Sequence, residues 1–453
     1  MRLARLEGVE ADQQPGAAEQ RRLAHLRRVE LRFRARVGEE RSGGRGAVHD
    51  EAPNGGRPHA RRGRGVTLCS ADSMGTTTTI EDAALGEELA TRLLALTAIP
   101  SVSRNEKALC DWLEARLRAV AGVAVQRTGD NLIATLPALA GRPRVVLCGH
   151  LDTVPENQNL PPRREGDLIH GLGTSDLKSG LAVLWKLLEE LASGLAAGRT
   201  AGLDPARLVC DPAFVFYARE EIAFAESGLL EVARDWPGLQ EAKFAVCVEP
   251  TSNAVELGCL GTMHAELTVR GKAAHAARPW LGVNAIHAAL PLLQRVAARA
   301  ERRWSPPGRS EIEYREVMSI TGIRGGKAKN VVPDECVMNL NFRFAPDRTP
   351  DDARAQVNAL AEGIAEVAFK DLAPAGRVAS GNPWCDRLVA LAGVARAKQA
   401  WTDVGRFTAM GLDAVSCGPG APELAHQQAE HASIRKMVES LHLFRRLVTN
   451  RTN

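Results

Sequence analysis

Two side chains suited to metal chemistry follow a short apolar segment of this 453-residue chain. His150 and Asp152 stand two positions apart in the segment GHLDTVP, directly after the run RVVL at 144–147. The β-branched run predicts a buried strand. An imidazole at the end of a strand can bind a metal ion while a neighbouring carboxylate fixes its tautomer and raises its basicity. The two residues could equally form an ordinary hydrogen-bonded pair, so the interpretation depends on which other donors the chain supplies.

Further acidic and histidine residues lie where predicted strands or loops end. They are Asp176 before a predicted helix, Glu220 and Glu221 after strand 213–217, Glu249 at the end of strand 244–248, and His426 in a loop rich in Gly and Pro. Each has an ordinary alternative, such as a helix N-cap for Asp176 or a solvated charge for the glutamates. Together with His150 they supply two imidazoles and several carboxylates without thiolates. This donor set is typical of catalytic zinc or of a two-metal hydrolase.

The elements that would position these residues alternate between strand and helix. We predict helices at 85–96, 109–120, 177–191 and 226–235, and strands at 131–136, 144–149, 213–217 and 244–248. Alternation of this kind indicates an α/β layer with a largely parallel sheet. Function concentrates at the carboxyl ends of such strands.

The pattern changes after Gly261. We predict strands at 263–270, 315–321 and 335–344, and helices at 284–302 and 350–369, which together make a compact α+β insert. Helix, strand and helix resume from Asn382. We therefore expect a catalytic domain in two parts, 74–262 and 376–453, interrupted by an inserted domain at 263–375. A cleft beside such an insert is a favoured binding site.

Composition limits the remaining possibilities. The nine cysteines are scattered without a CxxC pair, which favours a reducing cytoplasm over a disulfide framework or a thiolate zinc site. No apolar run approaches the roughly 18 residues that would span a bilayer. We accordingly expect a cytoplasmic protein without a membrane partner.

The net charge of +4 comes from the N-terminus, because residues 1–73 contain 15 Arg, no Lys and 10 acidic residues. The rest of the chain carries a net charge of −1. An Arg-rich arm could bind nucleic acid. The alternative is a disordered or non-native extension translated upstream of the true start, since Met74 opens a more ordinary N-terminal sequence. We favour the extension and expect no nucleic-acid partner.

An ordered set of motifs extends from Ile80 to the C-terminus: GHLDTVP, GLGTSDLKSGL, EEIAFAESGL, VEPT, GTMHAELTVRGKAAHAARPWLGVNAI and the late His426. As a set they resemble the di-zinc aminoacylase/carboxypeptidase family of metallopeptidases. The resemblance implies a zinc-peptidase-like catalytic domain with a mainly parallel sheet, interrupted by an α+β lid and dimerisation domain. It also implies a homodimer and two zinc ions, for which cobalt or manganese can substitute.

The resemblance implies a role for each candidate residue at the metal centre. His150 and Glu249 would bind the first zinc, Glu221 and His426 the second, Asp176 would bridge both, Asp152 would orient His150, and Glu220 would be the general acid/base. Close relatives usually carry an acidic residue where this chain has Ala429, which leaves the surroundings of His426 open.

The resemblance also implies roles for residues in the inserted domain. His275 would polarise the scissile carbonyl, often from the partner subunit of a dimer. Arg278, Asn330 and Arg343 match positions that hold substrate carboxylates, although Arg343 could also be an ordinary surface charge. Arginine suits such recognition because its guanidinium can pair with a carboxylate through two hydrogen bonds.

The implied activity is metal-dependent hydrolysis of an amide in a small substrate with several carboxylates. Within the family the match favours the succinyl-diaminopimelate desuccinylases of the lysine and diaminopimelate route, mainly through the segments ARPWLG and GGKAKNVVPD. N-acetylornithine deacetylases and other aminoacylases or dipeptidases remain alternatives. A non-catalytic interaction protein on the same scaffold would be expected to lack a ligand or the base, and this sequence lacks none.

Overall fold

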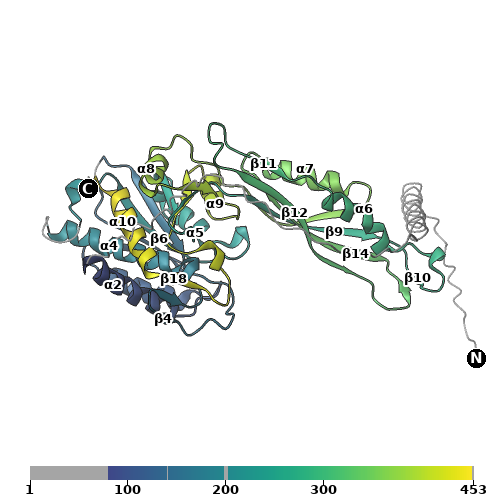
Figure 1. Cartoon of the computed structure of the whole chain (residues 1–453), viewed down its shortest axis with the longest axis horizontal. Helices are drawn as coiled ribbons and strands as arrows, with labels where there is room; N and C mark the ends of the chain where they lie inside the picture. Colours follow the sequence, from purple (N-terminus) through teal and green to yellow (C-terminus); the bar gives the residue numbers. More distant parts are fainter. Residues whose placement is uncertain (1–79, 140, 198–202, 451–453) are drawn as a thin grey trace, which may run out of the picture. The chain divides into compact units, whose positions relative to one another are not determined.

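The computed structural model describes residues 80–139, 141–197 and 203–450 (Figure 1). The expectations for the Arg-rich segment 1–73 lie outside these residues. By contacts the described chain forms two units. Of the described residues, the smaller comprises Val269–Pro291 and Gly325–Cys336, and the larger comprises those up to Thr268, Leu292–Arg324 and those from Val337 onward.

An eight-stranded sheet organises the larger unit, with the strand order β1-β2-β6-β3-β7-β17-β8-β16. The strands are β1 (Ala124–Thr128), β2 (Asn131–Thr135), β3 (Arg144–His150), β6 (Asp211–Tyr217), β7 (Phe244–Cys247), β8 (Val255–Leu257), β16 (Ala395–Ala397) and β17 (Ala414–Ser416). The central strands β6, β3, β7 and β17 are parallel to one another, whereas β1, β2 and β8 introduce antiparallel pairs. The mainly parallel α/β sheet predicted from the sequence is confirmed.

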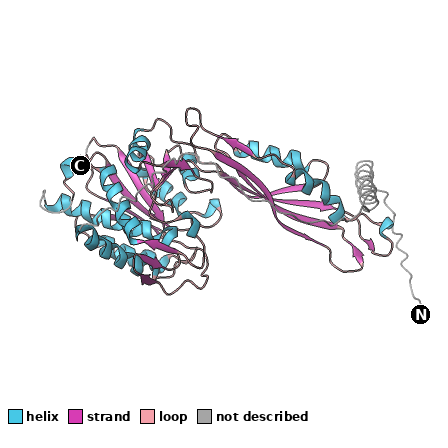
Figure 2. Cartoon of the chain, viewed as in Figure 1, coloured by secondary structure: helices cyan, strands magenta, loops and turns pink. Residues whose placement is uncertain are grey.

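Helices cover both faces of this sheet (Figure 2). On one face α2 (Ile80–Thr97), α4 (Ser179–Ala197) and α10 (Ile434–Val448) pack against one another, and α3 (Lys107–Arg118) contacts β1 and β2. Residues of α5 (Gly228–Asp235) and α9 (Val404–Ala409) belong to the apolar cluster of the other face. Consecutive residues of β3 point to opposite faces: Leu147 joins the first cluster and Val146 the second. Burial on both faces explains the continuous apolar run at 145–148.

A second, five-stranded sheet has the order β11-β12-β14-β9-β15. Its strands are β9 (Gly261–Arg270), β11 (Arg302–Trp304), β12 (Tyr314–Gly325), β14 (Glu335–Phe344) and β15 (Glu366–Ala373). Two helices belong to the same stretch of chain, α6 (Ala285–Ala297) and α7 (Pro350–Ala361). Thr349 and Asp352 form a reciprocal capping box that fixes the start of α7.

Shorter elements complete the described chain. They are β4 (Arg163–Glu165), β5 (Leu168–His170), β10 (Ala274–His275), β13 (Val331–Val332), β18 (His431–Ser433), α8 (Pro383–Ala392), η1 (Thr174–Lys178), η2 (Pro205–Arg207), η3 (Phe224–Glu226), η4 (Pro237–Leu239), η5 (Pro279–Leu281) and η6 (Pro422–Leu424). Strands β18, β5 and β4 form a small sheet, and β10 pairs with β13.

Two predicted helices are too long. The helix predicted at 284–302 ends at Ala297, and β11 begins at Arg302. The helix predicted at 350–369 ends at Ala361, and its last residues belong to β15. Gly363 has a φ of 70°, a left-handed conformation that commonly ends a helix. Beyond it, β15 pairs with β9, a distant partner that local periodicity does not reveal.

The described part of the chain contains no helix that is both long and apolar enough to cross a membrane. Its eight cysteines are buried free thiols.

Candidate metal centre

Three adjacent parallel strands deliver predicted ligands to one edge of the eight-stranded sheet. His150 is the last residue of β3, Glu220 and Glu221 follow β6, and Glu249 follows β7. Because the carboxyl ends of parallel strands meet at the same edge, these side chains converge although they are about 100 residues apart in sequence. Asp176 joins them from η1, the turn that precedes α4.

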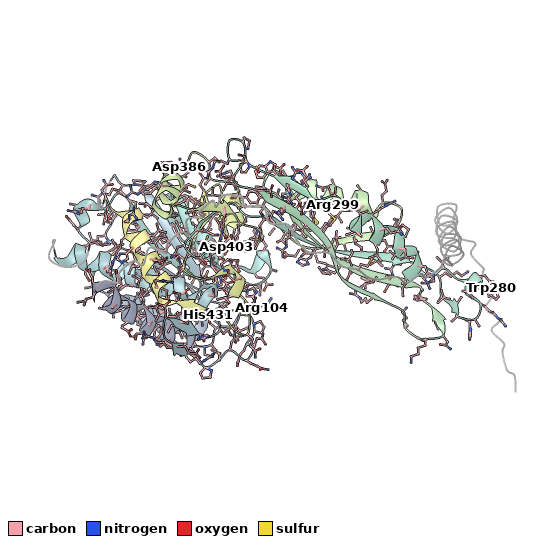
Figure 3. All side chains as sticks on the ribbon, viewed as in Figure 1. Arg104, Trp280, Arg299, Asp386, Asp403 and His431 are labelled. Atoms are coloured by element: carbon pink, nitrogen blue, oxygen red, sulfur yellow. The ribbon has the colours of Figure 1, made fainter. Side chains whose placement is uncertain are left out.

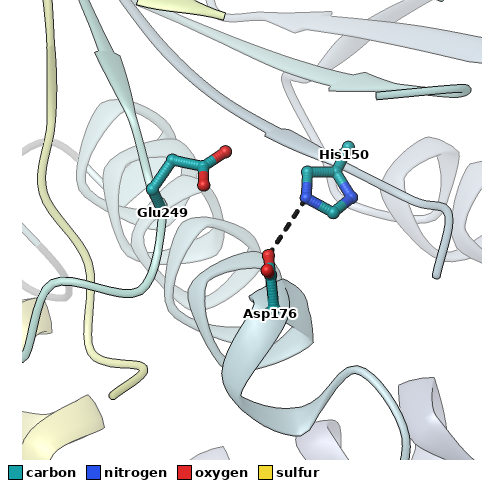
Figure 4. A group of neighbouring side chains, drawn as sticks. All are labelled: His150, Asp176 and Glu249. Carbon is teal, nitrogen blue, oxygen red and sulfur yellow. Dashed lines mark ion pairs between the residues drawn. The ribbon is translucent and has the colours of Figure 1, made fainter. Parts of the chain in front are cut away.

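The donor atoms form three overlapping groups, in each of which all atoms lie within 4.8 Å of one another. The groups are His150–Asp176–Glu249, His150–Glu220–Glu221 and Asp176–Glu221–His426. All five predicted metal ligands and the predicted base are therefore brought together. Figure 4 shows the first group, with the side chains of His150, Asp176 and Glu249 directed toward one another.

Asp176 lies between the two histidines. Its Oδ1 is 3.3 Å from His150 Nε2, and its Oδ2 is 3.5 Å from His426 Nε2. His426 Nε2 also lies 2.9 Å from Glu221 Oε1. A carboxylate that reaches one imidazole with each oxygen is placed as a ligand shared by two ions would be.

The carboxylates of the three donor groups place several negative charges close together. Burial, reinforced by the charge of Glu249, holds the pKa of Glu220 well above its ordinary value. Burial and the charge of Asp176 raise the pKa of Glu249 to about 8, and the same two causes raise the pKa of Glu221. Like charges in a desolvated site resist joint ionisation. A divalent cation would relieve this repulsion.

The pKa values of both histidines are raised, so their protonated form is favoured beside these carboxylates. The hydrogen bond with Glu221 raises the pKa of His426 to about 9. Burial alone would lower the pKa of His150, but Asp152 and Asp176 hold it well above its ordinary value. In addition, Glu249 Oε1 is buried and has no hydrogen-bond partner among the described residues. An unpaired carboxylate oxygen beside imidazole and carboxylate donors is in a suitable place to bind a metal ion.

Asp152 supports both sides of the site. Its backbone carbonyl lies 3.0 Å from His150 Nδ1, closer than its carboxylate, which is at 3.5 Å. The carboxylate instead accepts hydrogen bonds from the backbone N–H groups of Glu220 and Glu221, at 3.0 and 3.1 Å. Ser103 Oγ donates a further bond of 2.8 Å. Asp152 thus fixes His150 through its main chain and the two glutamates through its side chain.

Sequence reasoning missed Glu430, which is 2% exposed. Its carboxylate accepts hydrogen bonds from the backbone N–H groups of Gly173 (2.9 Å), Ser175 (2.9 Å) and Asp176 (3.0 Å). Burial raises its pKa to about 7, while these N–H groups act in the opposite direction. Glu430 therefore holds the turn that carries Asp176. Ala429 itself is not acidic, but the next residue supplies a carboxylate.

Lys178 supports the same turn and was also missed. It is 2% exposed, and its Nζ donates to the backbone carbonyls of Leu96 and Ile99 at 3.2 and 3.1 Å. Burial lowers the pKa of Lys178 to about 7. In the sequence this lysine resembles an ordinary first-turn helix residue, and no local signal marks it as buried.

Three of the predicted substrate-side residues belong to the smaller unit. His275 ends β10, its Nδ1 accepts a hydrogen bond of 3.1 Å from the Ala277 N–H, and its carbonyl accepts one of 2.8 Å from the Arg278 N–H. The Asn330 carbonyl accepts a hydrogen bond of 2.8 Å from the Ala276 N–H. His275, Arg278 and Asn330 are therefore neighbours within this unit.

Arg343 lies on β14 in the larger unit. Its Nε donates to Asn341 Oδ1 at 3.2 Å, and burial lowers its pKa. A partly buried guanidinium is not an ordinary surface charge.

Comparisons with known proteins place the chain among relatives of known name. Residues 258–367 match the family model described as "Peptidase dimerisation domain". The chain is 40% identical over 355 residues to a protein of Mycobacterium tuberculosis named putative succinyl-diaminopimelate desuccinylase, covering 78% of this chain and 95% of the relative. A succinyl-diaminopimelate desuccinylase of Corynebacterium glutamicum is 37% identical over 354 residues, covering 76% of this chain and 91% of the relative.

A solved structure shares the fold. The M20 family metallo-carboxypeptidase Sso-CP2 of Sulfolobus solfataricus superposes with a TM-score of 0.62 at 16% identity, covering 80% of this chain and 99% of that one. The identity and coverage of the curated relatives, with the match to the dimerisation domain, show that the chain belongs to the M20 family of metallopeptidases.

Proposed function

We propose that this chain is a two-metal amide hydrolase that converts N-succinyl-LL-diaminopimelate and water to succinate and LL-diaminopimelate. The observation that carries the proposal is the convergence of the three donor groups, one of which contains Glu220. The substrate is inferred from the relatives, of which the first is named a putative desuccinylase and is 40% identical with 95% of its length covered.

The residues present fit a pair of divalent ions. His150, Asp176 and Glu249 would hold one ion, and Asp176, Glu221 and His426 the other. When bound, such ions polarise a carbonyl and lower the pKa of water toward about 7. Imidazole and carboxylate donors suit zinc, with cobalt or manganese as possible substitutes.

Glu220 is the proposed general base and acid. Its raised pKa lets it accept a proton from the attacking water as the amide carbonyl carbon is attacked. It then delivers that proton to the nitrogen of the departing amine as the carbon–nitrogen bond breaks. The hydrogen bonds from its own N–H and from that of Glu221 to Asp152 hold this segment in place during both transfers.

The inserted domain, proposed at 263–375, would complete the substrate site. His275 would stabilise the oxygen of the scissile carbonyl as negative charge develops on it, from the partner subunit of a homodimer. Arg278, Asn330 and Arg343 would bind the carboxylates of the substrate. The match of residues 258–367 to a peptidase dimerisation domain supports the dimer.

A hydrolysis panel tests the substrate. Purified protein loaded with zinc is assayed with N-succinyl-LL-diaminopimelate, N-acetylornithine and dipeptides, and release of the primary amine is measured. We expect kcat/KM to be highest for the succinyl substrate. A preference for N-acetylornithine or a dipeptide would identify another activity of the same family, and no hydrolysis of any of them would favour a non-catalytic protein on this scaffold.

Glu220→Gln tests the mechanism. We expect it to retain its zinc while kcat falls by about 10²- to 10⁴-fold, the usual contribution of a general acid/base. Glu439→Gln, at an exposed position on α10, is the matched control and should keep wild-type turnover. Full turnover by a zinc-loaded Glu220→Gln protein would refute the proposed role.

A further inference from the structure

A buried ion pair lies in the interior of the larger unit, at the start of α9. Asp403 and Arg406 are both 0% exposed, and Arg406 Nε donates to Asp403 Oδ1 at 2.5 Å. Figure 3 labels Asp403 among the helices and strands of the body that contains the eight-stranded sheet. Burying two charges carries a desolvation cost that their attraction often fails to offset, so the pair is weak evidence for stability. Its contacts point to another role.

The guanidinium of Arg406 holds the segment that follows Glu220 and Glu221. Its Nη1 donates to the backbone carbonyl of Phe224, three residues after Glu221. The same guanidinium carbon lies 4.2 Å from the centre of the Phe224 ring. Arg406 therefore contacts both the main chain and the side chain of Phe224.

Trp401 contacts both Phe224 and Arg406. Its ring meets the Phe224 ring edge-on, with centroids 5.9 Å apart, and its centroid is 5.4 Å from the Arg406 guanidinium. Trp401 is itself anchored, because its Nε1 donates to the Pro374 carbonyl at 3.0 Å. Phe224, Arg406 and Trp401 therefore contact one another, and the Arg406 side chain is buried, which is the setting in which a cation–π attraction gains from desolvation.

The remainder of the segment is fixed from other elements. Asn131 Oδ1 accepts a hydrogen bond of 2.9 Å from the Ala218 N–H at the start, and Asp152 accepts those of Glu220 and Glu221 in the middle. The far end contains η3, whose residues are not buried. Arg406 holds the Phe224 carbonyl in this far end, and Arg219 Nε donates to the Glu226 carbonyl at 2.8 Å.

We propose that Arg406, oriented by Asp403, is a positioning residue that sets the placement of Glu220 and Glu221 through the backbone of Phe224. Its effect on turnover rests on the proposed function of the site. Its effect on the order of residues 218–228 does not depend on that function, because the contacts involve only this chain's own main chain and side chains.

The test compares Arg406→Lys with the wild type by hydrogen–deuterium exchange and by kinetics. Lysine keeps a charge for Asp403 but has neither the planar fork nor the stacking surface of arginine. We expect peptides covering 218–228 to lose protection, with and without zinc, while peptides from α10 exchange as in the wild type. With both metal sites filled, kcat should fall by about 100-fold, the effect of a displacement near 1 Å, with little change in KM.

A second variant tests whether the effect of Arg406→Lys comes only from leaving a charge buried without its partner. Asp403→Asn/Arg406→Met removes both charges together, so neither is left buried alone. It should likewise loosen residues 218–228 and lower kcat. The matched control is Arg445→Lys, which alters a partly buried pair with Glu190 (2.6 Å) between α10 and α4 and should leave both measurements unchanged.

The outcomes separate the two proposals. Wild-type protein without hydrolytic activity, combined with selective loosening of 218–228 in the variants, would support the positioning role and refute the proposed function. Unchanged exchange in this segment would overturn the positioning role whatever the activity. So would a fall in kcat that accompanies equal loosening of α10, because that result indicates a general structural defect.

Discussion

Replacing Glu430 with glutamine tests whether this buried carboxylate holds the turn that carries Asp176. Oε2 accepts the Gly173 N–H, and Oε1 accepts those of Ser175 and Asp176. An amide has only one acceptor oxygen, so at least one buried N–H would lose its partner, which costs about 1–3 kcal/mol. The charge itself adds no net stability, because the raised pKa of Glu430 means that ionisation of its carboxyl is disfavoured in the folded protein. We therefore expect Glu430→Gln to lower the free energy of unfolding by about 1–3 kcal/mol.

The assay is urea unfolding of the zinc-free protein at pH 8, where a carboxyl with a pKa of about 7 is ionised in the wild type. Zinc affinity, measured by competition with a chelator, should fall by about 10- to 100-fold, as for other residues that orient metal ligands. Glu423→Gln, at an exposed position of the same loop, is the control and should change stability by less than about 0.5 kcal/mol. An unfolding free energy within about 1 kcal/mol of wild type, with unchanged zinc affinity, would refute the reasoning.

Three further predictions address the metal content, the thiols and the N-terminus. His426→Ala removes a donor from one ligand group and leaves His150–Asp176–Glu249 intact. Metal analysis after dialysis should therefore find one ion per chain where the wild type holds two. Two retained ions would contradict the assignment. Burial raises the pKa of Cys110 to about 12, so at pH 8 its thiolate fraction is about 10⁻⁴, and iodoacetamide should label it in urea but not in the native protein. A chain that begins at Met74 should keep the kcat/KM of the full chain and, like it, fail to shift labelled DNA, whereas DNA binding by the full chain alone would show that the Arg-rich arm is functional.

Much of the fold can be predicted because its core elements are strongly patterned. The strand at 144–150 contains an uninterrupted apolar run at 145–148, and α4 carries apolar residues at helical spacing. The errors occur where a distant partner decides the structure. Residues 366–369 were predicted as the end of a helix, but they form β15 because β9, about 100 residues earlier, offers an edge for pairing. No local pattern contains that information.

The donors of the candidate site could be found because each lies at the end of a recognisable strand or in a loop with distinctive composition. Their individual roles came from the resemblance to a family and not from spacing. Even so, Asp152 shows what residue types leave open. The sequence indicates that it stands beside His150, but not that its main chain meets the imidazole while its carboxylate holds Glu220 and Glu221.

The supporting residues escaped prediction for a physical reason. A metal ligand is recognisable because its chemistry resides in its own side chain, whereas a support is defined by the main-chain group that it reaches. Glu430 lies more than 250 residues from the N–H groups that it binds, and Arg406 lies 182 residues from the carbonyl of Phe224. Read along the sequence, both look like ordinary charged residues. Only the folded chain reveals that each is buried against the main chain of a segment carrying a candidate ligand or base, and that property makes them the informative positions for mutation.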